Sequence, residues 1–414
     1  MMPPLPLRLL RAADRAATAM GVAGANLETD DLMQCALERM QISAFCDRAF
    51  VPALRRLLDS YEREADLNLF GRYAARWDVL RCLTNLLRFE AEEARAPEIL
   101  QQRIERPIFI TGLPRSGTTL LHALLALDPA LRAPRCWQTI SPYPEGAKDD
   151  RRETVERQLR LFQRLTPDMA AMHPMAANSP QECTEITAQI FQSLRYEMTY
   201  RVPSYQAWID GHGHLPAYRF HKRFLQHRQH QEGGGRWVLK SPDHIHALSA
   251  IKSVYPDCGL VFVHRDPLRV IASAAKLTEA VRQPFARCID KVELGVQALN
   301  RLKEAVETML EIAKADRGGN IFHLRYTDFA KNPMASIETL YRHFDLKLDN
   351  DLRRRMRAFL AATPAPSNHY AIEEFGIDPR TLRDAFQDYI QYFGVAPEAP
   401  VWCAGEDIRI PIAA

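Results

Sequence analysis

The residues between Gly112 and Thr119 combine glycines, hydroxyl side chains and a basic side chain at close spacing. A Walker-type loop has the sequence G-x-x-x-x-G-K-[ST] between a strand and a helix, and its lysine contacts the outer phosphates of a nucleotide. In the stretch PIFITGLPRSGTTLLHALLAL, Gly112, Gly117 and Thr119 stand at that spacing, but Thr118 replaces the lysine. Free N–H groups at a helix start still favour an oxyanion. We therefore expect a loop that holds a phosphate-like group but is not built to hydrolyse a triphosphate.

Side chains inside this loop add further donors for an anion. Arg115 supplies a guanidinium, which presents a rigid fork of N–H groups to an oxyanion. Three hydroxyl groups surround it. The residues that we assign to the anion site are Pro114, Arg115, Ser116, Gly117, Thr118 and Thr119.

A second anion site is expected in the stretch GLVFVHRDPLRVIASAAKL. Arg265 ends a strand pattern, Asp266 suits the N-cap of the following helix, and Pro267 suits its first position. Ser273 follows two turns later. Arg265 and Ser273 can together bind a second phosphate. Taken alone, an Arg–Asp surface pair with an ordinary helical serine explains the same pattern equally well.

Lys240 is a third basic residue at the end of a strand pattern, in WVLKSP. Burying its ammonium group beside no anion would be costly, so an anion is expected close to it. The alternative is a solvated lysine at a strand end.

These residues need elements that bring them together, and the sequence predicts a parallel sheet. Short apolar runs that end in polar residues alternate with helical patterns; they are PIFITG, RWVLKSP, GLVFVHRDP and NIFHLRYTDF. Such alternation is typical of an α/β fold with helices on both faces of a parallel sheet, here P-loop-like. Ligands bind at the carboxyl ends of such strands. All three basic residues fall there.

Two helical regions are expected outside the strands. Residues 1–100 are rich in Ala, Leu, Arg and Glu at helical spacing, and form a predicted N-terminal helical region. Residues 101–414 form the predicted catalytic domain. Within it, residues 134–236 are mostly helical and dense in aromatics, Met and His, and we expect them to cover the ligand edge as a substrate wall.

Composition narrows the class of protein. The 414 residues carry a net charge of only +3, from 54 basic and 51 acidic residues, which gives no reason to expect a nucleic-acid partner. The eight cysteines form no C-x-x-C pair, and with no secretory leader pattern they indicate a cytoplasmic protein with reduced, buried thiols. The first twenty residues favour an amphipathic helix over a membrane-surface segment. No transmembrane segment is predicted.

The order of the motifs GLPRSGTTLL, WVLKSP and VFVHRDPLRVIASAAKL resembles the PAPS-dependent sulfotransferases, in the bacterial-type branch related to tyrosylprotein sulfotransferases. The resemblance runs from about Leu54 to Gly394 and includes PQEC, YTDFAKNP and HYAIEEFGID. It implies 3′-phosphoadenosine 5′-phosphosulfate (PAPS) as cofactor. The 5′-phosphosulfate would lie on the loop from Arg115 to Thr119, and the 3′-phosphate on Arg265 and Ser273.

The resemblance also implies roles for the basic residues. Arg115 and Lys240 would stabilise charge on the transferring group, and no metal is expected. Tyr326, at the end of the last strand, is a candidate to stack on adenine, and Tyr370 a candidate to close over the nucleotide; both are equally well explained as core aromatics.

The general base is an open question in the sequence. Related enzymes have a Trp–Glu pair after the loop helix, but here the pair is Trp137–Gln138, and an amide cannot accept the proton. We favour His173, because histidine titrates near neutrality. Glu182 is a second candidate, although Ser179-Pro180-Gln181-Glu182 also fits a capping box. His244 is a third.

The expected function is sulfuryl transfer to the hydroxyl group of a small-molecule or lipid-like acceptor, since the aromatic-rich region shows no groove lined with basic residues. Two alternatives differ in class. A P-loop kinase would need Mg²⁺-dependent ATP turnover, and Thr118 argues against it. A non-catalytic nucleotide-binding protein is suggested by Gln138, and would bind nucleotide without transferring a sulfuryl group.

Overall fold

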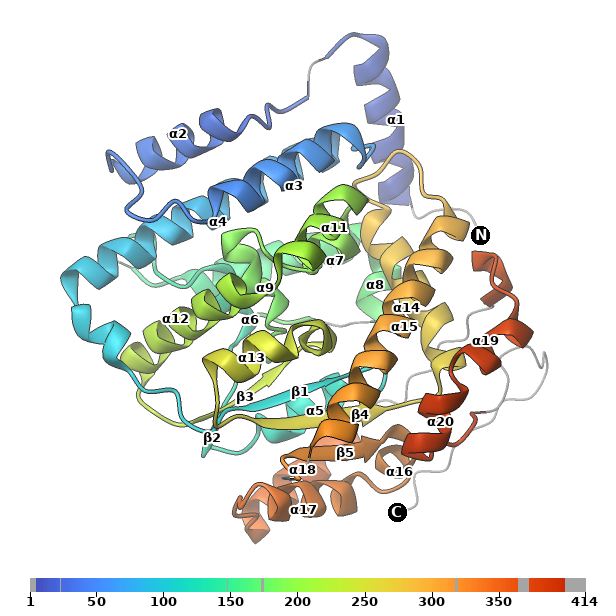
Figure 1. The fold of residues 1–414 in the computed structure, drawn as a ribbon. Helices are drawn as coiled ribbons and strands as arrows, with labels where there is room; N and C mark the ends of the chain where they lie inside the picture. The colour runs from blue at the N-terminus through green and yellow to red at the C-terminus, as the bar shows by residue number, and fades with distance from the viewer. Residues whose placement is uncertain are drawn as a thin grey trace.

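A single parallel sheet lies at the centre of the molecule (Figure 1). The computed structural model describes residues 5–22, 24–146, 148–172, 175–316, 319–363 and 372–398. The strand order is β2-β3-β1-β4-β5, and every pairing is parallel. The bounds are Ile108–Gly112 (β1), Leu131–Arg132 (β2), Arg236–Lys240 (β3), Gly259–His264 (β4) and Ile321–Arg325 (β5). The predicted α/β class is confirmed, as are four strands; β2 is too short to show a pattern.

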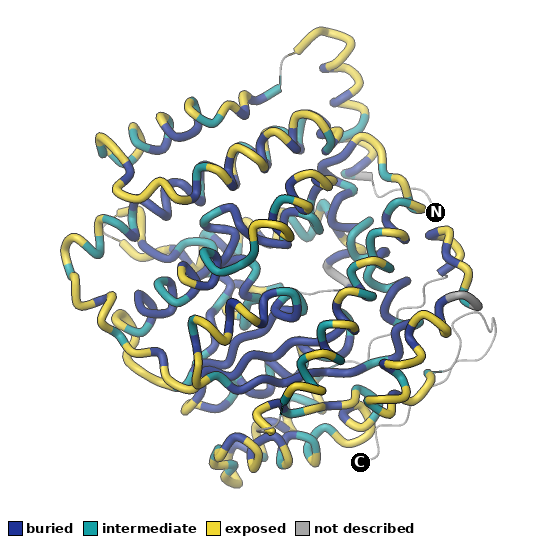
Figure 2. Tube along the Cα trace, in the orientation of Figure 1, coloured by how far each residue is buried: buried dark blue, intermediate teal, exposed yellow. Residues whose placement is uncertain are grey.

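The sheet is covered on both faces because its side chains alternate between two apolar cores. Phe109 and Phe262 join the larger core, whereas Ile108, Val261 and Val263 join the smaller one. The central strands β1 and β4 are therefore buried along their whole length, as expected for a parallel sheet between two layers of helices, whereas the edge strand β5 exposes His323 and Arg325. Figure 2 shows the central strands buried, with exposed positions on the outer sides of the helices and in the connecting loops.

Among the described residues up to Gln101, all regular elements are helices, apart from an isolated bridge between Leu67 and Ala286. They are α1 (Leu5–Ala19), α2 (Thr29–Met40), α3 (Val51–Arg63), α4 (Leu69–Arg95) and the 3-10 helix η1 (Pro97–Gln101). Their apolar side chains, such as Leu54 and Leu83, belong to the same core as Phe109 of β1. The N-terminal helices thus pack directly onto the rest of the molecule.

A buried network of ion pairs joins Asp78 and Arg81 of α4 to Glu185 and Arg195. Arg81 donates to Asp78 at 2.7 Å and to Glu185 at 2.6 Å, and Arg195 donates to Asp78 at 2.5 Å. Burial alone would raise the pKa of Asp78, but Arg195 and Arg81 hold it at about 2. The four charges therefore compensate one another, and removing one would leave its partners buried without a counter-charge.

Residues 134–235 form helices in the described ranges, apart from an isolated bridge between Arg135 and Pro180, and β3 begins at Arg236. The helices are α6 (Cys136–Ile140), α7 (Arg151–Leu165), α8 (Pro167–Met172), α9 (Thr184–Thr187), η2 (Ala188–Ile190), α10 (Arg195–Thr199), α11 (Pro203–His212) and α12 (Leu215–Glu232). In Figure 1, α6 to α12 lie between the N-terminal helices and the sheet.

The remaining helices flank the strands and complete the chain. They are α5 (Thr118–Leu125), η3 (Pro242–Ala247), α13 (Leu248–Val254), α14 (Pro267–Arg282), α15 (Lys291–Ala315), α16 (Tyr326–Lys331), α17 (Pro333–His343), α18 (Asn350–Ala362), η4 (Ile372–Phe375), α19 (Pro379–Ala385) and α20 (Gln387–Phe393). Among the helices described, none is both long and apolar enough to cross a bilayer. Cys82, Cys136 and Cys183 are buried free thiols as expected, but Cys46 and Cys288 are exposed.

Candidate active site

The loop between β1 and α5 is shaped by its glycines. Gly112 has a φ of 135°, and a Cβ there would lie 2.2 Å from the carbonyl oxygen of Val263 on β4. Gly117 has a φ of 85°, and its Cβ would press against the Tyr326 ring at 3.2 Å. Since L side chains rarely adopt such φ values, glycine is required at both positions. The loop thus turns tightly at the strand end, as the sequence predicted.

Arg115 is held in place at the centre of the loop. Its Nε donates to Ser273 Oγ at 3.1 Å, and its Nη1 donates to the carbonyl oxygen of Met172 at 2.9 Å. Ser116 is fully buried, and its hydroxyl donates to the carbonyl oxygen of Leu113 at 2.5 Å. Arg115 therefore spans the space between the loop, α14 and the end of α8.

Lys240 reaches from the end of β3 to the first turn of α5. Its Nζ donates to Thr119 Oγ1 at 3.0 Å and forms a short ion pair with Glu182. Only 2% of the lysine side chain is exposed, compared with 23% for Glu182. The backbone reinforces this pairing, because the N–H of Cys183 donates to the carbonyl oxygen of Lys240 at 3.0 Å. The expectation of an anion beside a buried Lys240 is met by Glu182.

The capping-box interpretation of Glu182 was wrong. No helix begins at Pro180; it forms an isolated antiparallel bridge with Arg135, and α9 begins only at Thr184. The backbone N–H of Gln181 donates to Pro134 instead. The local pattern failed because pairing with a distant segment keeps these residues extended. Glu182 is consequently directed to Lys240 rather than to a helix start.

The second predicted anion site lies against the first. Arg265 Nη1 donates to the carbonyl oxygen of Arg115, and its guanidinium carbon stacks 3.9 Å from the centre of the Tyr326 ring. Asp266 caps α14 as expected, accepting from the N–H of Leu268 at 3.0 Å. Ser273 bonds to Arg115 rather than to Arg265. The structure thus brings Arg115, Arg265, Ser273 and Tyr326 into one continuous cluster.

The other candidate bases differ in position. His173, the favoured candidate base, lies outside the described residues, as does Tyr370, the candidate to close over the nucleotide. His244 is fully buried, with Nδ1 at 2.5 Å from the Tyr218 hydroxyl and its ring edge-on to Phe109. Burial lowers the pKa of His244 well below its usual range. Its ring is therefore neutral and packed as a core group.

Gln138 takes a local role near α6. Its Oε1 accepts from the backbone N–H of Arg135 at 2.8 Å, and its Nε2 donates to Glu232 at 2.6 Å. The amide therefore serves as part of a helix cap and bonds a carboxylate at the end of α12. These contacts require an amide N–H, which a glutamate at this position would lack.

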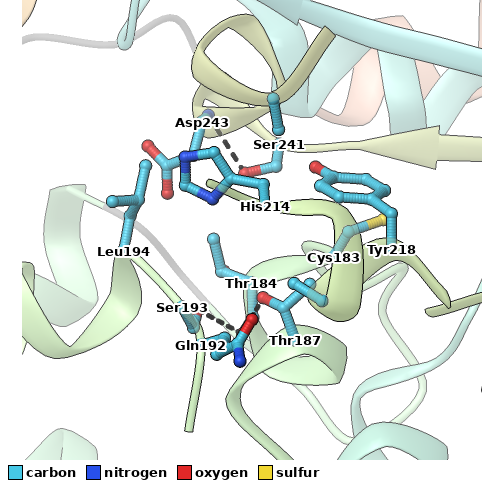
Figure 3. A pocket seen from close by; sticks show the side chains of 12 residues that line it. Cys183, Thr184, Thr187, Gln192, Ser193, Leu194, His214, Tyr218, Ser241 and Asp243 are labelled. Atoms are coloured by element: carbon cyan, nitrogen blue, oxygen red, sulfur yellow. Dashed lines mark hydrogen bonds between the residues drawn. The ribbon is translucent and has the colours of Figure 1, made fainter. Parts of the chain in front are cut away.

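Asp243 is a carboxylate that sequence reasoning missed. It follows Ser241, whose Oγ accepts from its backbone N–H at 3.2 Å, and it lines a cavity of about 20 Å³. Figure 3 shows Ser241 and Asp243 facing Thr184 and Ser193 across this cavity. Burial, together with the nearby carboxylate of Glu182, raises the pKa of Asp243 to about 7. An acidic residue just after K-S-P, at the ligand edge, was the available signal.

The chain matches known sulfotransferases in sequence and in structure. A model described as the sulfotransferase family matches residues 107–350. Omega-hydroxy-beta-dihydromenaquinone-9 sulfotransferase Stf3, from Mycobacterium bovis and from Mycobacterium tuberculosis, is 24% identical over 271 residues. That alignment covers 62% of this chain and 66% of the relative, so it spans slightly less than two thirds of the relative's length.

Two solved structures share most of the architecture. Sulfotransferase STF9 from Mycobacterium avium has 26% identity and a TM-score of 0.82, over 91% of this chain and 99% of that one. Sulfotransferase STF1 from Mycobacterium tuberculosis has 27% identity and a TM-score of 0.77, over 87% and 98%. The family match contains the loop, Lys240, Arg265 and Tyr326 and covers more than half of the residues. The chain belongs to the sulfotransferase family.

Proposed function

We propose that the chain transfers a sulfuryl group from PAPS to the hydroxyl group of a lipid-like acceptor. The observation that carries this proposal is the contact between Arg265 and the backbone of Arg115. It joins the two anion-binding segments into one surface. A nucleotide with phosphate groups at both its 5′ and 3′ positions needs two such adjacent cationic sites, whereas ADP and ATP need only the first.

The residues of this surface fit the proposed cofactor. Gly112 and Gly117 allow the loop to turn without a Cβ atom at either end, and the backbone N–H groups at the start of α5 would bind a 5′-phosphosulfate. Arg265 forms a bidentate pair with the carboxylate of Glu398, at 2.7 and 2.8 Å, which demonstrates that its guanidinium can accommodate an oxyanion. When bound, PAPS supplies an activated sulfuryl group on a phosphate leaving group.

The cations of the chain would act on charge that develops during transfer. Lys240 bonds Thr119 in the first turn of α5, and Arg115, within the loop, bonds Ser273 of α14. Lys240 is buried, so its ammonium group is weakly screened by water and interacts strongly with negative charge. We assign Lys240 and Arg115 to stabilising the leaving phosphate.

We propose that Glu182 accepts the proton of the acceptor hydroxyl, with His173 as the competing assignment. Glu182 touches Lys240 and is partly exposed, so an acceptor can approach it from the same edge of the sheet. Its carboxylate would take the proton of the acceptor hydroxyl and hold it at an Oε atom. His173 follows Met172, whose carbonyl oxygen accepts from Arg115.

A lipid-like acceptor is supported by the apolar surroundings of Arg115. Met169 and Met172 of α8 pack against Ala280 and Val281 of α14 in a separate cluster. Flexible methionine side chains adapt to apolar ligands of irregular shape. The similar Stf3 protein is named for a menaquinone derivative, which agrees with an apolar acceptor.

The test is sulfuryl transfer from ³⁵S-labelled PAPS to a panel of hydroxylated prenyl quinones, sterols, fatty alcohols and sugars. Labelled product with an apolar hydroxyl compound, and none with sugars, is the expected outcome. Labelling of sugars alone would contradict the acceptor class. Binding of PAPS without transfer to any member of the panel would favour a nucleotide-binding protein instead.

A further inference from the structure

Arg265 is paired with a carboxylate from the far end of the described chain. Its Nε donates to Oε1 of Glu398 at 2.7 Å, and its Nη2 donates to Oε2 at 2.8 Å. The two residues are 133 positions apart in the sequence. Both side chains are largely withdrawn from water, with 17% of Arg265 and 15% of Glu398 exposed.

Glu398 is fixed by more than this pair. Its backbone N–H donates to Oδ2 of Asp266, the N-cap of α14, at 2.9 Å, and Arg269 lies 3.9 Å from its carboxylate. The carboxylate thus lies at the start of α14, where the N–H groups and the helix dipole favour negative charge. A phosphate group would use the same donors in the same geometry.

We propose that the carboxylate of Glu398 and the 3′-phosphate of the nucleotide compete for Arg265. The inference rests on the proposed function, which assigns the 3′-phosphate to Arg265. Two anions cannot share one bidentate guanidinium face, so binding of the nucleotide requires Glu398 to withdraw. Glu398 then sets the affinity for every ligand with a 3′-phosphate.

The competition has a functional consequence. After transfer, the product 3′-phosphoadenosine 5′-phosphate (PAP) keeps its 3′-phosphate and must leave before the next turnover. A carboxylate that replaces it on Arg265 lowers the affinity for PAP and accelerates its release. Glu398 lies beyond residues 107–350, the part of the chain that the family model matches.

The opposite role for Glu398 makes an opposite prediction. If the carboxylate only held Arg265 in a binding-competent orientation, its removal would weaken PAP binding. If it competes, its removal strengthens PAP binding. The sign of one affinity change therefore separates the two roles.

The experiment is titration calorimetry of PAP and ADP on the wild type and on Glu398→Gln, Glu398→Ala, Arg265→Ala and the double variant Arg265→Ala/Glu398→Gln. Asp388→Asn, at an exposed position of α20, controls for the loss of one negative charge. We expect both Glu398 variants to bind PAP about fivefold more tightly, the scale of a partly exposed arginine–carboxylate pair. ADP affinity should remain unchanged, and stopped-flow release of PAP should slow by a similar factor.

The Arg265→Ala background distinguishes two kinds of failure. There, Glu398→Gln should have no effect, because the contested guanidinium is gone. If Arg265→Ala weakens PAP binding but the Glu398 variants leave it unchanged or weaker, competition is refuted and the proposed cofactor site survives. If Arg265→Ala does not weaken PAP binding, the assignment of the 3′-phosphate itself fails.

Discussion

The two cationic ends of the candidate site differ in how their charges are paired. Lys240 at the end of β3 is buried, and its carboxylate partner, Glu182, lies just before α9. Arg265 at the end of β4 is more exposed, and its partner, Glu398, lies near the end of the chain. In our proposal the first carboxylate takes part in the chemistry, whereas the second occupies the place of a ligand group. The same type of ion pair therefore has a catalytic role at Lys240 and a ligand-competing role at Arg265 in our proposal.

The largest effect is expected at Glu182. Glu182→Gln should lower kcat by roughly 10²–10⁴-fold, the range for loss of a general base, with little change in PAP affinity. Glu153→Gln, an exposed site on α7, is the matched control. Steady-state kinetics with labelled PAPS measures both. Full activity of Glu182→Gln together with an inactive His173→Ala would move the base to His173.

Lys240 should rank second. Lys240→Ala should reduce kcat on the order of a hundredfold, because its contact strengthens as charge develops on the leaving phosphate. Lys252→Ala, at an exposed position of α13, should be unaffected. Circular dichroism must show that the variant is folded, since Glu182 would lose its buried partner. A rise in KM with kcat unchanged would assign Lys240 to simple binding.

At the other end of the site, Arg265→Ala should affect binding rather than chemistry. The wild type should bind PAP at least about tenfold more tightly than ADP, and the variant should lose that preference. ADP affinity should stay the same, because ADP lacks the 3′-phosphate. Calorimetry with the two nucleotides on the two proteins provides the comparison. Equal wild-type affinity for PAP and ADP would overturn the cofactor assignment.

Asp243 should affect stability in a pH-dependent way. Because its pKa is about 7 in the folded protein and near 4 when unfolded, the folded state retains a proton that the unfolded state has released. The contribution of Asp243 to the free energy of unfolding is therefore greatest at low pH and falls as the pH rises from about 4 through 7. Asp243→Asn should remove this slope, a difference on the order of 2 kcal/mol, in urea titrations at pH 5 and 8. Equal slopes in both proteins would contradict the raised pKa.

The smallest expected effect concerns metal ions. The loop's positive charge comes from Arg115, Lys240 and backbone N–H groups, so EDTA should leave turnover unchanged. Activity assays with EDTA, and after adding back Mg²⁺, measure this directly. A strict requirement for Mg²⁺ would instead support a kinase-like reaction with ATP.

Sequence patterns predicted the α/β fold and the strand ends at which the candidate site residues lie. Both depend on residues that are close together in the sequence. The strands were recognisable as short apolar runs, and the ligand residues follow from the rule that parallel strands end at one edge. Asp266 and the loop glycines also followed from rules for single elements. These features need no knowledge of distant contacts.

The partners of the charged residues could not be predicted in the same way. Glu182 looked like part of a helix start, since nothing near it in the sequence reveals the bridge between Pro180 and Arg135. Glu398 pairs with a residue 133 positions away, and no periodic pattern encodes such a contact. Asp243 was overlooked because an aspartate after a serine and a proline is common in first turns. The contacts of Glu182, Glu398 and Asp243 are determined by tertiary packing, which local sequence propensity does not encode.

The ion network between α4 and residues 134–236 limits how segments of this chain can be exchanged for those of related proteins. Glu185, three positions after Glu182, is anchored by Arg81 of α4, which in turn bonds Asp78. Exchanging residues 134–236 for those of another sulfotransferase, in order to change the acceptor, would separate these charges. We therefore expect that α4 must be exchanged together with residues 134–236, because Asp78 and Arg81 of α4 are the charge partners of Glu185 and Arg195.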